Sequence, residues 1–486
     1  MTPRLSPRLS LALGLPLALA ACGLKPAPEV ATPPPELPGD FFYAPDRGSD
    51  MSLASLLPRE DPAFTALAGA AMDGAPSLAE ALARVDLARG QAARAGAERL
   101  PSVNADASLR EQRINPAQFG EAGASGLIPR NLTQYGANVS ASWDPDIFGQ
   151  LRAQERAALI RIDAATAQAA AVRNALLSEI AASVIDWRTL DARRAALKAD
   201  ETAARRLATL AATREQAGIA PGFDRVRAEA QASASLSRLS ALESERVRIL
   251  GRLVTLTGMD AASISRAFGR GDPVTDLLDA PRALPSELLV NRPDVLAASA
   301  QLAASDADLA AASRARFPRF TLSGVIGLLA FDPEDLFDSN SIVGNLTAGV
   351  AGPLLDFGRI EAEIDSAAAG KRAAFAAYRG AVFQALGDAE AAYGLIAASD
   401  TEATQAIRER DQLERAAALA DARYRAGLAD FLTVLEARRA ADASGERAAA
   451  AIGRARRARV LLWQALGGDP PAPSTASESD RGASAE

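Results

Sequence analysis

The chain contains two copies of one long segment. The run DIFGQLRAQERAA around Phe148 matches LDFGRIEAEIDSAA around Phe357, 209 residues later, and AGIAPGFDRVRAEAQ matches AGLADFLTVLEARRA at the same offset. Upstream, Leu100-Pro101-Ser102 matches Phe317-Pro318-Arg319 at an offset of 217, so the first copy holds about eight extra residues in between. A tandem duplication of this size predicts one architecture built twice, about a pseudo-symmetry axis.

The first residues have the pattern of a lipoprotein signal. Arg4 and Arg8 precede an apolar run over residues 9–21, which has the charge and length of a secretory signal peptide and is too short to span a membrane. The run leads into LAAC, which resembles the lipobox of bacterial lipoproteins. Cys22 is therefore expected to be acylated and to begin the mature chain. By the same resemblance, Gly23 after it favours sorting to the outer membrane.

Charge and residue usage exclude several function classes. The chain carries a net charge of −7 even with the two signal-peptide arginines counted, which argues against a nucleic-acid partner. It holds no histidine and a single cysteine, so Ser-His-Asp triads, the common zinc ligand sets and intrachain disulfides are excluded. No Gly-rich phosphate loop lies between a strand and a helix. We expect no enzyme activity, no metal and no cofactor apart from the covalent lipid on Cys22.

Proline, glycine and hydrophobic periodicity divide the chain into six segments. The expected segments are a signal peptide over 1–21, an acylated tether over 22–60, a first repeat over 61–258, a linker or equatorial segment over 259–290, a second repeat over 291–468 and a disordered tail over 469–486. The first repeat is expected to hold strands at about 101–112 and 133–144 and long helices at about 150–216 and 222–257. The second is expected to hold strands at about 318–330 and 341–352 and long helices at about 358–425 and 430–466.

The predicted strands alternate apolar side chains with small or polar ones. The stretch after Pro101 has period two, as do the stretches ending at Trp143 and beginning at Phe320. This pattern suits a soluble sheet with one wet face, and it also suits a membrane wall with lipid outside and water inside. Strands of about 9–11 residues are long enough to cross a bilayer, whereas after the signal no run of about 18 apolar residues could cross as a helix.

The predicted helices are unusually long. Residues 150–216 contain neither proline nor glycine, which gives on the order of 100 Å of helix. Small and apolar residues between Ile162 and Leu190 recur at spacings of three, four or seven, which is typical of a coiled-coil seam. Alanine dominates both the seam and its flanks. Helices of this kind can pack on more than one side and belong in a wall or bundle.

The strand count predicts an oligomer. Four strands per chain cannot close a membrane barrel, whose single-chain forms start at eight, and open strand edges are not tolerated in lipid. Two chains would give about 8 strands and three about 12, and 12 strands leave an aqueous lumen. The predicted fold class is an internally duplicated α+β membrane protein. In it a long α-helical barrel joins an outer-membrane β-barrel closed between three chains, with four strands from each.

One segment closely resembles a known family. The run LPSELLVNRPDVLAASAQLAASDADLAAASRARFPRFTLSG over 284–324 resembles the TolC-like outer membrane efflux proteins, lipoprotein branch, as do DIFGQLR, RYRAGLADFLTVLEARR and the LAAC anchor. The resemblance covers about residues 60–468. It implies a homotrimer in the bacterial outer membrane that extends into the periplasm. It also implies an exit duct for an inner-membrane efflux transporter of the RND type, coupled through a periplasmic adaptor (membrane fusion protein).

The resemblance also implies two functional sites. The helix-to-helix turns would be periplasmic tips that contact the adaptor, at Ala217, Gly218, Ile219, Ala426, Gly427 and Leu428. The glycine in each turn also fits a local need, because a reversal between helices favours a residue that tolerates positive φ. A ring of Asp421 carboxylates would narrow the closed tube, and Arg423, Tyr424 and Arg425 would form the bonds that lock it.

Two classes of function remain distinguishable. The first is a passive channel for multidrug efflux without chemistry of its own, and a duct for type I protein secretion is its nearest alternative. The second is a structural or adaptor lipoprotein of the periplasm, which explains the lipobox and the helices but not four strands of membrane length. The duplicated strand-loop-strand unit favours the channel.

Overall fold

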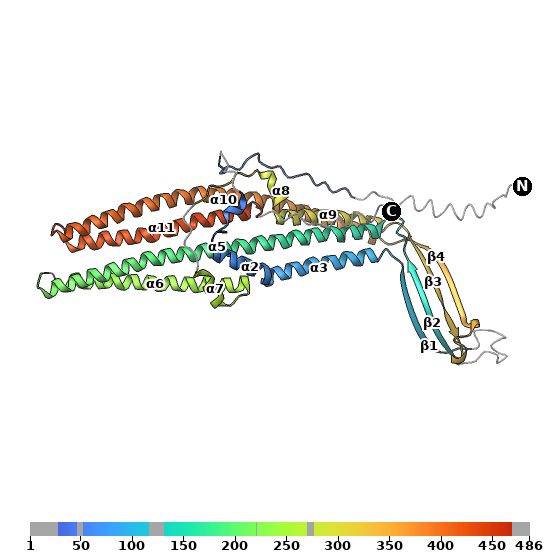
Figure 1. The fold of residues 1–486 in the computed structure, drawn as a ribbon. Coiled ribbons are helices and arrows are strands. Elements are labelled where there is room, and N and C mark those ends of the chain that lie inside the picture. Colours follow the sequence, from blue (N-terminus) through green and yellow to red (C-terminus); the bar gives the residue numbers. More distant parts are fainter. Residues whose placement is uncertain (1–27, 46–51, 116–130, 220, 270–276, 469–486) are drawn as a thin grey trace. The chain divides into compact units, whose positions relative to one another are not determined.

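The computed structural model describes residues 28–45, 52–115, 131–219, 221–269 and 277–468 (Figure 1). Between residues 53 and 268 the elements are η1 (Leu53–Leu56), α2 (Pro62–Gly74), α3 (Pro76–Ala97), β1 (Ser102–Arg113), β2 (Asn131–Trp143), α5 (Gln150–Gln216), α6 (Gly222–Thr257) and α7 (Ala261–Phe268). Then follow η3 (Pro285–Glu287), α8 (Leu288–Asn291), α9 (Pro293–Arg314), β3 (Arg319–Ala330), η4 (Pro333–Asp335), η5 (Ser339–Ser341), β4 (Ile342–Ala351), α10 (Arg359–Arg425) and α11 (Phe431–Ala465). Within the described ranges, no helix combines the length and the apolar character that crossing a membrane requires.

The lengths of the elements repeat the duplication seen in the sequence. Helices α3 and α9 each have 22 residues, α5 and α10 each have 67, and α6 and α11 have 36 and 35. Each repeat also contributes two of the four strands. The prediction of an internally duplicated, mostly helical chain with four strands is confirmed.

Besides the four-residue α8, two short helices were not predicted from the sequence. Helix α2 begins where the Asp61 side chain accepts a hydrogen bond from the Ala63 N–H and Pro62 fills the first helical position. Helix α7 begins at Asp260, whose side chain accepts from the Ser263 N–H, and it buries Ile264 and Phe268. Both starts carry an ordinary capping signal, but the helices have only 13 and 8 residues, too few for a long periodic pattern.

The described residues belong to two compact units, each with its own core. Of the described residues, those in 28–33, 87–115, 131–162 and 300–376 form the first unit, which contains the sheet. The remaining described residues, up to 468, form the second unit, which contains both helix-to-helix turns.

The four strands form one antiparallel sheet in the order β1-β2-β3-β4 (Figure 1). Its register places the polar residues of neighbouring strands on one face, so that Asp106 lies opposite Asn138 and Asn138 opposite Gly327. The Asn138 side chain donates to the Asp106 carboxylate at 3.2 Å. A Cβ atom at Gly327 would collide with the Asn138 side chain and lie 2.6 Å from the Ala137 carbonyl oxygen. Only glycine at this position leaves space for the Asn138 side chain.

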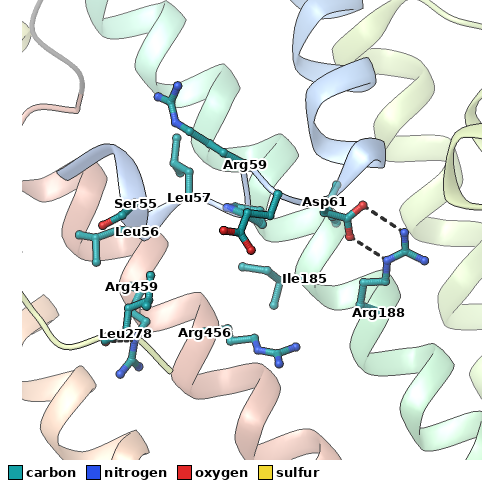
Figure 2. Close-up of a pocket in the computed structure, with 13 residues that line it drawn as sticks. Ser55, Leu56, Leu57, Arg59, Asp61, Ile185, Arg188, Leu278, Arg456 and Arg459 are labelled. Atoms are coloured by element: carbon teal, nitrogen blue, oxygen red, sulfur yellow. Dashed lines mark hydrogen bonds and ion pairs between the residues drawn. The ribbon is translucent and has the colours of Figure 1, made fainter. Parts of the chain in front are cut away.

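The core of the second unit contains a buried ion pair. Asp61, at the start of α2, accepts from Arg188 of α5 through both carboxylate oxygens, at 2.8 and 3.1 Å (Figure 2). Arg188 also donates to the Phe268 carbonyl at 3.1 Å, and the Phe268 ring stacks on Trp187 at 4.2 Å. The pair therefore joins α2, α5 and α7 at one point of the core.

The NRPD motif carries much of the family resemblance. It connects the first residues of the second repeat with its last helix. Arg292 is buried and donates to Asp294 at 3.0 and 2.6 Å, to Asp388 at 3.0 Å and to the Ala465 carbonyl at 3.1 Å. Just beyond α11, Gly467 has φ +100°, and a Cβ there would lie 2.5 Å from the Asn291 carbonyl oxygen. The motif holds the end of α11 against the start of the second repeat.

Candidate functional site

Both predicted tips turn through the same backbone motif. In the first, the Ile219 N–H donates to the Arg214 carbonyl at 2.9 Å and the Gly218 N–H donates to the Glu215 carbonyl at 2.9 Å. The second turn makes the same two bonds 209 residues later. These pairs define a Schellman ending, whose glycine adopts positive φ: +70° at Gly218 and +76° at Gly427.

The tip residues face outwards. All six predicted tip residues are exposed, and the side chains of Ile219 and Leu428 are 75% and 70% accessible. A Cβ atom added at Gly218 or Gly427 would meet nothing within 4 Å. The backbone conformation alone therefore favours glycine at these turns, and the apolar side chain after each glycine is mostly exposed.

A small hydrophobic core joins the two hairpins just behind their tips. Tyr424 and Phe431 pack edge to face at 6.0 Å, beside Val434 and Leu435 from the second hairpin. From the first hairpin, Arg214 lies over the Tyr424 ring at 4.5 Å and donates to its hydroxyl at 2.6 Å. The buried Tyr424 thus ties the two repeats of one chain together.

The four residues of the predicted gate have different surroundings. Asp421 forms an ion pair with Arg425 at 2.7 Å, one helical turn further on. Tyr424 is engaged by Arg214, and Arg423 is exposed while its carbonyl accepts from the Leu428 N–H at 2.8 Å. The structure therefore brings Asp421 and Arg425 together and turns Tyr424 into the core of its own chain. A ring of Asp421 carboxylates from several chains remains a prediction.

A buried acidic pair, which the sequence did not reveal, lies between α5 and α11. Asp200 accepts from Ser235 and from Arg238, the latter at 3.2 Å, and shares a small cavity with Asp442. Burial, together with a hydrogen bond to Asp200, raises the pKa of Asp442 to about 8. The raised pKa favours the protonated form of Asp442 beside Asp200, where a helix of the first repeat lies next to one of the second.

The tether is docked on α10 before the body of the chain begins. The N–H groups of Phe42 and Tyr43 donate to the two carboxylate oxygens of Glu390, each at 3.0 Å. Phe41 is buried against Tyr393 at 5.5 Å between ring centres. This attachment point was not predicted, because no local signal in the sequence links residues almost 350 positions apart.

Cys22, the predicted acylation site, lies outside the described residues. Within the described part of the chain, no three Asp, Glu or Cys side chains gather in the way a metal ion would need.

Comparison with known proteins gives a consistent result. The family model for the outer membrane efflux protein matches residues 67–259 and 284–468, which are the two repeats. The chain is 31% identical to the pyoverdine export outer membrane protein OpmQ of Pseudomonas aeruginosa, over 93% of this chain and 95% of that one. It is 27% identical to the toluene efflux pump outer membrane protein TtgF of Pseudomonas putida, over 94% and 96%.

Solved structures show the same similarity. The outer-membrane channel OprN matches with a TM-score of 0.82 at 25% sequence identity, over 91% of this chain and 99% of that chain.

Proposed function

Because this chain belongs to the outer membrane efflux protein family and is the outer membrane channel of an efflux pump, we propose that it works as a passive homotrimeric duct. Its substrates would arrive from an inner-membrane transporter through a periplasmic adaptor. OpmQ and TtgF are named for the export of pyoverdine and toluene. Small organic molecules are therefore the proposed cargo, in preference to the proteins of type I secretion, and a multidrug range is part of this proposal.

The observation that supports the trimer is the four-stranded sheet with two open edges. Strands β1 and β4 each have a partner on one side within the chain, and their side chains are almost all exposed. Such edges are not stable in lipid, and three copies would supply about 12 strands. The native mass of the protein extracted from outer membranes in mild detergent tests this directly. Three chains are expected, and a monomer released without detergent would refute the channel.

The tips are the proposed adaptor contacts. Their exposed Ile219 and Leu428 side chains are apolar, and both hairpins present the same turn. Apolar side chains that stand exposed at the end of a protein are suited to burial by a partner.

Replacement of Asp421 by alanine is expected to raise the conductance of the channel in planar bilayers. Three carboxylates near one axis would narrow the tube and hold cations, and removing them takes away both effects. The exposed Asp365 on the same helix provides a matched control, since Asp365→Ala should leave conductance unchanged. An unchanged conductance in Asp421→Ala would remove this residue from the gate.

Replacement of Cys22 by alanine is expected to leave the fold intact and to weaken membrane anchoring. Acylation is proposed here from the LAAC sequence, and the docking of residues 41–43 on α10 gives the tether a fixed attachment to the body. The four strands would still keep part of the protein in the membrane without the lipid. Fractionation at high salt measures the loss. Full retention of the variant would count against the lipid as the main anchor.

A further inference from the structure

The two copies of one aromatic residue have opposite surroundings. Phe148, between β2 and α5, stacks on Phe317 at 4.7 Å between ring centres and lies 6.2 Å from the ring of Phe320. Its counterpart Phe357, between β4 and α10, is 91% exposed. The duplication therefore places the same side chain once against the rings of Phe317 and Phe320, called the socket below, and once in solvent.

The socket is also present twice. Phe317 and Phe320 lie at the start of β3, and the residues 217 positions earlier, at the start of β1, are Leu100 and Val103. Leu100 and Val103 are 66% and 67% exposed. One chain therefore carries an apolar side chain without a socket at β4 and an apolar socket without an occupant at β1. These elements stand at the two open edges of its sheet.

The strand register shows that the two sequence offsets hold within the sheet. In the first hairpin Ser102 lies opposite Ser142. Adding 217 to the first and 209 to the second gives Arg319 and Ala351, which lie opposite each other in the second hairpin. The pairing of β2 with β3 inside the chain can therefore serve as a template for the pairing of β4 with β1 between chains.

We infer that β4 of one copy pairs with β1 of the next in the register Ala348 opposite Leu109, with Phe357 seated on Leu100 and Val103 of that next copy. The template is the pair Val139–Ile326, whose counterparts are Ala348 and Leu109. The inference deepens the proposed trimer and rests on it, since it names the surfaces by which copies join.

The faces of the strands agree with this register, although they were not used to derive it. Leu109 lies on the face of the sheet that also carries Val139, Ile326 and Ala348, which is its apolar face. A slip of one residue would put Ala348 opposite Arg110 and would turn the apolar side chains of β4 towards the polar face of β1. Side chains alternate between the two faces along a strand. Only a shift of β4 along β1 by an even number of residues therefore keeps both faces continuous.

Paired cysteines test the register in the full-length protein in native outer membranes. The chain has one cysteine, Cys22, which is kept because the proposed acylation blocks its thiol. With an oxidant, Leu109→Cys together with Ala348→Cys is expected to give covalent dimers and trimers on a denaturing gel, since directly opposed strand residues lie within disulfide reach. Arg110→Cys with Ala348→Cys, on opposite faces, and Glu111→Cys with Ala348→Cys, slipped by two residues, are the matched controls.

The outcomes separate the register from the trimer. Stronger cross-linking of the Glu111→Cys pair than of the Leu109→Cys pair would overturn the register while leaving the trimer intact. Absence of cross-links in a protein whose native mass is that of three chains would overturn it as well. A monomeric native mass would refute the proposed channel itself.

The contact of Phe357 with Leu100 and Val103 is tested by the temperature at which the trimer dissociates on a semi-native gel. Phe357→Ala and the double variant Leu100→Ala/Val103→Ala are each expected to lower this temperature. Their combination should lower it no further than the larger single loss, because residues in contact are not additive. Fully additive losses would show that Phe357 does not sit on Leu100 and Val103, and would overturn that part of the inference.

Discussion

Replacing Arg188 with methionine is expected to destabilise the folded chain by about 3–5 kcal/mol, because the substitution leaves the buried Asp61 carboxylate without its cation. The two side chains are only 7% and 2% accessible, so the carboxylate is largely shielded from bulk water. Arg188 also donates to the Phe268 carbonyl, which would lose that hydrogen bond. The yield of folded protein and the midpoint of denaturant unfolding measure the effect.

An exposed pair of the same chemistry provides the control. Arg454 and Glu402 form an ion pair at 2.5 Å, but their side chains are 54% and 51% accessible, so Arg454→Met should cost no more than about 1 kcal/mol. The double variant Asp61→Asn/Arg188→Met should recover part of the loss, since no charge is then buried alone. Equal losses in Arg188→Met and Arg454→Met would mean that burial of the first pair does not matter for stability.

The parts of the fold that the sequence predicted are those with local or periodic signals. Strand β1 was recognisable because its side chains alternate with period two, and α5 because 67 residues run without proline or glycine. The duplication strengthened both predictions, since each element had to occur twice. The buried Asp61–Arg188 pair could not be predicted, because its members are 127 residues apart and nothing near either residue indicates the other.

The candidate site divides in the same way. The turn at each tip is a local property of the backbone, and the glycine that it needs marks it in the sequence. The attachment of the tether depends on Glu390, a helical carboxylate that looks like any other exposed acid until Phe42 and Tyr43 are placed beside it. The proposed ring of Asp421 carboxylates would be formed by several copies of the chain, and no local signal in the sequence marks such a contact.

Gly427→Val is expected to abolish export while leaving the trimer and its membrane insertion intact. A β-branched residue is a steric outlier at the +76° φ of this position, and left-handed backbone costs roughly 1–2 kcal/mol for ordinary residues. The end of α10 would unwind, and Leu428 would leave the position from which it is proposed to contact the adaptor. The measurement is the sensitivity of cells to pump substrates, for which full sensitisation is expected, together with cross-linking to the adaptor.

Gly427→Asn is the matched control, because asparagine adopts the left-handed conformation readily and no atom lies within 4 Å of its new Cβ. It should retain most of the export that valine loses, although it adds a larger polar group at the same place. The same pair of substitutions at Gly218 asks whether both hairpins are needed. If valine and asparagine were equally harmful, the added side chain and not the backbone conformation would be the cause, and the contact surface would include Gly427 itself. If neither had an effect, the adaptor would not use the tips.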